Sequence, residues 1–135
     1  MTDAALMGKK LAQIDTCLSD LRRIARPELL GSDIRERRFV EHTLQIAIQA
    51  ALDVASHIVS DGRLGEPQTN RDLFDLLARA GWIEPIQAEP LKNMAGFRNI
   101  LVHGYDDVDL NIVRSILDVH LNDLASFAAS VRARL

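Results

Sequence analysis

Cysteine, aromatic residues and long apolar runs are all scarce in this sequence of 135 residues. Its single cysteine, Cys17, excludes an intrachain disulfide and a metal cluster built from cysteines. No apolar stretch approaches the roughly 18 residues that a membrane-spanning helix needs. The amino-terminal segment also lacks the basic and then apolar order of a secretory signal. We therefore expect a cytoplasmic protein, kept reduced and without a membrane partner.

The low aromatic content and the balanced charge narrow the ways in which this chain can bind nucleic acid. Only 4% of the residues are aromatic, which argues against reading of single strands by base stacking. The net charge of −3 does not by itself indicate a nucleic-acid partner. The basic residues, however, are 13 arginines and 3 lysines, and arginine binds phosphate through planar, bidentate contacts. Any RNA binding must therefore come from a local patch.

The sequence does hold enough apolar residues for a hydrophobic core. It is 47% hydrophobic and 26% charged, a balance that is typical of globular proteins and excludes disorder throughout. The length suits a single domain, which we place at residues 1–135.

Apolar residues recur at helical spacing along almost the whole chain, and no segment favours a strand. We predict helices over about residues 5–25 and 33–60, and a short one between 69 and 81. A fourth runs from 86 or 90 to 103, and a single last helix follows the acids at 106–109. The fold class is therefore all-α, an up-and-down bundle of four main helices plus a short one.

Residues with known preferences for helix ends support these bounds. Pro27 ends the first helix, and Thr69 with Asp72 has the spacing of a capping box. Gly81 suits the end of the short helix, as Gly104 suits the end of the fourth.

A polar line on the second helix combines residues that rarely occur together on a buried face. His42, Gln45, Gln49, Asp53 and His57 recur at spacings of three and four, so they project from one side. Asp53 and His57 are candidates to support an active site or a dimer contact. The alternatives are an ordinary pair on the helix surface and a buried pair whose members satisfy each other. Their separations from His42 match no metal-ligand signature, so we assign no metal site.

The sequence contains no phosphate loop, no serine-nucleophile motif and no zinc-protease motif. The segment from Phe97 to Tyr105 is therefore the remaining candidate for catalytic residues. Arg98 and His103 are five residues apart, which places them about 140° from each other around an ideal helix. They therefore converge only if the helix ends at His103 or if two copies of the chain meet. In a structural role, both would instead bind free carbonyls at the end of the helix.

An arginine and a histidine around one phosphodiester suffice for RNA cleavage in principle. Histidine moves protons near neutral pH, and arginine stabilises the negative charge of the transition state. The 2′-hydroxyl of the RNA would be the nucleophile, so neither a metal ion nor another cofactor is required.

The pattern Arg98-Asn99-x-x-x-His103-x-Tyr105 resembles the motif of HEPN ribonuclease toxins, in particular the HepT-like branch of toxin–antitoxin modules. The similarity covers about residues 35 to 130. It includes, in the same order, the segment 53–58, the loop 64–67, the helix around residues 74–77 and the block 91–105.

This resemblance implies a metal-independent endoribonuclease in which two chains form one composite cleft. Arg98 and His103 would carry catalysis, and Asn99 would orient the site or contact RNA. Tyr105 matches the tyrosine that a partner nucleotidyltransferase, the antitoxin, adenylylates. The expected partners are thus an RNA substrate, this antitoxin and a second copy of the chain.

Two other functions are compatible with the same residues. One is a helical module without catalytic activity that docks a nucleotidyltransferase, and the other is a metal- or ligand-binding bundle centred on Asp53 and His57. A basic cluster near the first interhelical turn would bind RNA phosphates, meet the antitoxin or simply form a solvated face. It consists of Arg22, Arg23, Arg26, Arg35, Arg37 and Arg38.

Overall fold

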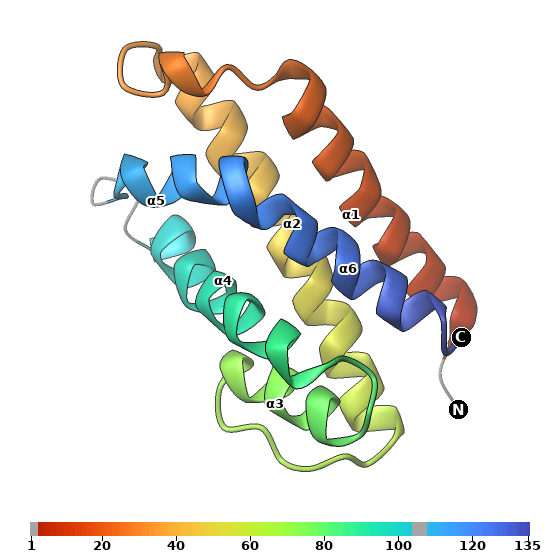
Figure 1. Ribbon diagram of the computed structural model, residues 1–135. Coiled ribbons are helices and arrows are strands. Elements are labelled where there is room, and N and C mark those ends of the chain that lie inside the picture. Colours follow the sequence, from red (N-terminus) through yellow and green to blue (C-terminus); the bar gives the residue numbers. More distant parts are fainter. Residues whose placement is uncertain (1–2, 104–107) are drawn as a thin grey trace.

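The chain folds into helices that pack around one long central helix (Figure 1), as a computed structural model that describes residues 3–103 and 108–135 shows. Helices α1 (Ala4–Ile24) and α2 (Ile34–Asp61) are joined by a short 3₁₀ turn, η1 (Pro27–Leu29). Then come α3 (Asn70–Arg79), α4 (Pro85–His103), α5 (Leu110–Ser115), a π-helical turn η3 (Ile116–His120) and α6 (Leu121–Arg132). No strand occurs in the described residues, so the all-α prediction is confirmed.

Helix α1 buries the face that its spacing predicts and covers one side of α2. The residues of this face are Met7, Leu11, Ile14, Cys17, Leu18 and Leu21. Asp3 caps the helix by accepting a hydrogen bond from the Leu6 amide, at 3.1 Å from N to Oδ1. Burial, with Asp20 nearby, raises the pKa of the Cys17 thiol, so this cysteine acts as an apolar packing residue.

Helix α2 is the central element, since it packs against α1, α3, α4 and α6. In its second half, buried residues point in several directions and include Ala47, Ala50, Ala51 and Ala55, whose small side chains allow neighbouring helices to approach closely. In its first half the fully buried positions narrow to a single stripe around Val40, Thr43 and Leu44. The opposite side of this first half is therefore open toward the end of α4.

The short helix α3 and helix α4 form a pair at the far end of α2 (Figure 1). The capping box is confirmed, with the Thr69 amide donating to the Asp72 carboxylate at 3.3 Å. Gly81 has a φ of +81°, which glycine adopts without strain and which lets the chain turn toward α4. Helix α4 begins at Pro85, continues through Pro90 and is last described at His103, since Gly104 lies outside the described residues.

The last helix is not the single α-helix that we predicted, because a π-helical turn interrupts it at Ile116–His120. The buried side chains explain the turn. Ile116 and Leu121 both face the core although Leu121 is five positions after Ile116. An α-helix returns to the same face after about four residues, and a π-turn accommodates the one extra residue. Asp109 caps α5 as predicted, while Asp106 and Asp107 lie outside the described residues.

One hydrophobic core cluster takes residues from all of these helices. None of the described helices is long and apolar enough to cross a membrane. Phe74 of α3 and Phe127 of α6 meet edge to face, with ring centroids 5.8 Å apart and an interplanar angle of 86°. This contact ties the α3–α4 pair to the last helix.

Replacing Phe127 by alanine should reduce the free energy of unfolding by about 3–5 kcal/mol, because the ring is fully buried and would leave a cavity. Urea denaturation measures the change. Val119→Ala, on the same stretch of chain but 65% exposed, is the matched control and should change stability by less than about 0.5 kcal/mol. Equal effects of the two substitutions would contradict the assigned core.

Candidate functional site

The predicted catalytic residues lie on the last turns of α4. Arg98 is half-buried, and its Nη1 donates a hydrogen bond to Asn99 Oδ1 at 3.2 Å. Its Nε is buried and has no hydrogen-bond partner among the described residues. His103 is exposed at the end of the helix. Tyr105, the predicted modification site, lies outside the described residues.

The structure does not bring Arg98 and His103 together within one chain. Both belong to one continuous α-helix, in which five residues correspond to a rotation of about 140°. The two side chains therefore leave the helix in different directions. A site that uses both groups on one phosphate needs a second chain, as the sequence already indicated.

Asp53 and His57 lie on α2 and contact α1. The Asp53 carboxylate accepts a hydrogen bond from Gln49 Nε2 at 2.8 Å and forms an ion pair with Lys10 Nζ at 3.0 Å. His57 Nε2 accepts a hydrogen bond from the Asp3 amide at 3.2 Å. These contacts hold the first turns of α1 against α2.

Potential metal ligands are dispersed in the structure. In residues 3–103 and 108–135, no three histidine, cysteine, aspartate or glutamate side chains lie close enough to form a metal-binding group. The bundle centred on Asp53 and His57 thus offers no such group there, and Asp53 is already bound to Lys10 and Gln49.

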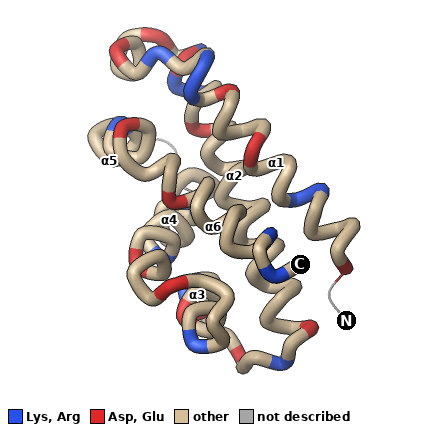
Figure 2. Tube along the Cα trace, turned by 45° about the vertical axis from the view of Figure 1, so that its right-hand side comes forward, with Lys and Arg blue, Asp and Glu red and all other residues tan. Residues whose placement is uncertain are grey.

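Basic positions gather, together with acidic ones, around the first interhelical turn (Figure 2). The arginines of this cluster divide into those with and those without a side-chain partner among the described residues. Arg22 Nη2 donates to Asn122 Oδ1 at 2.7 Å, and Arg23 lies 3.6 Å from the Asp20 carboxylate. The guanidinium groups of Arg37 and Arg38 instead make no hydrogen bond or ion pair to any described residue. Both belong to the open first half of α2.

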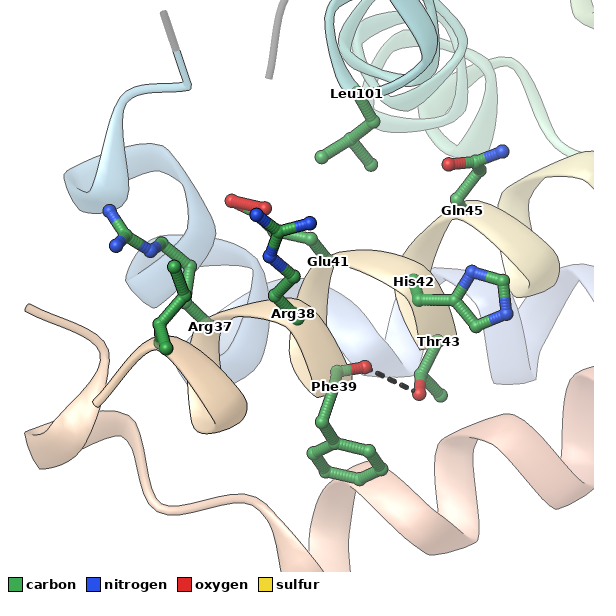
Figure 3. A pocket seen from close by; sticks show the side chains of 9 residues that line it. Arg37, Arg38, Phe39, Glu41, His42, Thr43, Gln45 and Leu101 are labelled. Atoms are coloured by element: carbon green, nitrogen blue, oxygen red, sulfur yellow. Dashed lines mark hydrogen bonds between the residues drawn. The ribbon is translucent and has the colours of Figure 1, made fainter. Parts of the chain in front are cut away.

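A cavity of about 630 Å³ lies between this part of α2 and the end of α4 (Figure 3). Leu101, which stands between Arg98 and His103 in the sequence, forms its α4 side. The residues on the α2 side are Ile34, Arg37, Arg38, Phe39, Glu41, His42, Thr43 and Gln45. The volume is within the range of small-molecule and nucleotide sites.

Glu41 is a charged residue of this cavity that the sequence analysis did not single out. Burial raises the pKa of its carboxyl group, and the positive charges of Arg37 and Arg38 oppose that rise. Its Oε2 is buried and has no hydrogen-bond partner in the described part of the chain. The only signal in the sequence was its spacing of four residues from both Arg37 and Gln45, which places the three on one side of α2.

Comparison with known proteins identifies relatives over most of the chain. A family model described as ribonuclease HepT-like matches residues 14–131. The mRNA nuclease HepT of Shewanella oneidensis is 34% identical over 125 residues, which are 92% of this chain and 94% of that protein. The tRNA nuclease HepT of Aphanizomenon flos-aquae is 31% identical over 104 residues, which are 77% of this chain and 71% of that protein.

The fold agrees with these relatives. The solved structure of the tri-AMPylated Shewanella oneidensis HEPN toxin in complex with MNT antitoxin has a TM-score of 0.88 and 33% sequence identity to this chain. The alignment covers 98% of this chain and 99% of that one. The resemblance found in the sequence motif is thus confirmed over the whole domain, and the chain belongs to the HepT-like ribonuclease family.

Proposed function

We propose that this protein is the toxin of a toxin–antitoxin pair, an endoribonuclease that cleaves RNA in the cytoplasm without a metal ion. The observation that carries the proposal is that Arg98 and His103 both lie on the last turns of α4, the helix whose Leu101 lines the cavity. Two relatives named as nucleases of mRNA and of tRNA support RNA as the substrate.

In the proposed reaction the RNA supplies its own nucleophile. His103 accepts the proton of a 2′-hydroxyl, and the 2′-oxygen attacks the adjacent phosphorus. Arg98 binds the phosphate oxygens and stabilises the additional negative charge of the transition state. The bond from phosphorus to the 5′-oxygen breaks, and the leaving oxygen takes a proton from water. The hydroxide that remains takes the proton from His103, which restores the base. The products are a 2′,3′-cyclic phosphate and a 5′-hydroxyl end.

The proposed active form is a homodimer, because one chain cannot direct both side chains at the same phosphate. A two-fold axis near the ends of the two α4 helices would place Arg98 of one copy opposite His103 of the other. Asn99, bonded to Arg98, then holds the guanidinium in position. Asp53 and His57 support the site from a distance by fixing α1 to α2.

The proposed control is adenylylation of Tyr105 by a nucleotidyltransferase antitoxin. The relative from Shewanella oneidensis that is tri-AMPylated and in complex with MNT antitoxin supports this assignment. Tyr105 is two residues beyond His103, so each added phosphate brings negative charge next to the cleft. That charge would repel the RNA backbone.

Arg98→Ala and His103→Ala should each lower kcat for RNA cleavage by at least about 100-fold, since each removes a group that acts on the reacting phosphate. Cleavage of short fluorescent RNAs in the presence of a chelator measures the rate. Arg79→Ala, at the exposed end of α3, is the matched arginine control and should retain the rate. Full cleavage by His103→Ala would contradict the assignment, and a rate that the chelator abolishes would contradict metal independence.

Mixing the two inactive variants should restore cleavage if the site is composite. A mixed dimer has one site with both mutations and one with neither, so an equimolar mixture should reach about a quarter of the wild-type rate. The measurement follows subunit exchange, and mass photometry or light scattering confirms that dimers are present. An inactive mixture of confirmed dimers would show that each site takes both groups from one chain.

Tyr105→Phe should retain cleavage and escape control by the antitoxin, because it lacks the hydroxyl that receives AMP. Intact-mass spectrometry after incubation with the nucleotidyltransferase and ATP should detect AMP on the wild type and none on the variant. A modified Tyr105→Phe protein would place the adenylylation site elsewhere.

A further inference from the structure

Arginine side chains with no hydrogen bond or ion pair to a described residue are concentrated at the start of α2. Most of the 13 arginines bind another side chain or a backbone carbonyl, as Arg71 binds the Lys92 carbonyl and Arg134 that of Ala80. Within residues 3–103 and 108–135, six have no such contact, and four of these fall between residues 26 and 38. The six are Arg26, Arg35, Arg37, Arg38, Arg63 and Arg79.

Arg37 and Arg38 differ from the other four because they line the cavity. Figure 3 shows both side chains rising from α2 on the side that faces Leu101 of α4. Along the axis of α4, Leu101 lies about 4.5 Å from the level of Arg98 and about 3 Å from that of His103. The two guanidinium groups thus line a cavity whose α4 side is formed within a turn of Arg98 and His103, on the helix that carries the proposed catalytic residues.

The remaining polar groups of the cavity have unused hydrogen-bonding capacity. Glu41 Oε2 is buried without a donor, which costs free energy unless a ligand supplies one. The half-buried Gln45 amide makes no hydrogen bond to any residue that the structure describes, and an amide can both donate and accept. Carboxylate and amide groups of this kind read the edges of unpaired bases.

We propose that this cavity is a nucleotide subsite for the RNA strand next to the scissile bond, in which Arg37 and Arg38 bind a phosphate and Glu41 with Gln45 selects the base. The base that fits best is guanine, because its Watson–Crick edge offers two adjacent N–H donors to a carboxylate. Uracil offers one donor between two acceptors and fits worst. This proposal rests on the proposed ribonuclease function. It adds that the enzyme recognises the base of one nucleotide next to the scissile bond.

RNA binding without cleavage tests the phosphate contacts directly. In the His103→Ala background, the double substitution Arg37→Ala/Arg38→Ala should weaken binding of a labelled single-stranded RNA by about tenfold or more. It should also reduce the slope of log affinity against log salt by about 0.7 for each phosphate that the variant no longer binds. Fluorescence anisotropy over a salt series measures both. Arg79→Ala, an equally unpaired arginine on α3, should change neither.

Base selection is tested with oligouridine RNAs that carry a single guanine, adenine or cytosine. Cleavage by the wild type should occur preferentially beside the guanine, and Glu41→Gln should reduce this preference several-fold while cleavage continues. Glu66→Gln, in the exposed loop after α2, is the matched control. Thermal unfolding confirms that each variant is folded.

The outcomes separate the subsite from the underlying function. A wild type that cleaves RNA, together with unchanged binding and salt slope in the Arg37/Arg38 variant, would overturn the subsite and leave the ribonuclease intact. An unchanged base preference in folded Glu41→Gln would overturn the role of Glu41. A folded, unmodified wild type that binds RNA through Arg37 and Arg38 without cleaving it would overturn the ribonuclease function instead.

Discussion

The packing of α2 against four other helices is the constraint from which the rest of the molecule follows. Its second half is buried in several directions, and alanines there let α1, α3, α4 and α6 approach it closely. Burial of this apolar surface is the main favourable term in folding, so these contacts determine the position of every other helix. They also determine where the end of α4 must lie.

The first half of α2 has a different role because, in the described part of the chain, one of its sides borders the cavity. In this half, some residues are buried in the core, such as Val40 and Leu44, and others line the cavity, such as Arg37 and Gln45. One helix thereby anchors the domain with one half and forms the wall of the cavity with the other. The motif on α4 is brought to this wall by apolar contacts, of which Leu101 is part.

Most of the fold could be predicted from the sequence because its signals are local. Helical spacing, the capping box at Thr69 and Gly81 each depend on a few neighbouring residues, and the HepT-like family was identified from an ordered motif. The π-turn and the cavity could not be predicted in this way. The π-turn depends on the tertiary packing that brings both Ile116 and Leu121 into the core. The cavity depends on how Leu101 lies relative to a helix that is more than fifty residues earlier in the sequence. The roles of Arg98, His103 and Tyr105 remain predictions, since a single chain keeps the first two apart.

The π-turn at Ile116–His120 also determines where this region of the chain can lose a residue. Deleting one residue between Ile116 and Leu121 would restore ordinary α-helical winding, with the two side chains four positions apart and still on one face. Leu124, Phe127 and Val131 would then stay in the core, and Arg132 would stay near Asp15. The same deletion inside α6 has no extra residue to remove, so it would rotate everything that follows by about 100° and turn that apolar face away from the core.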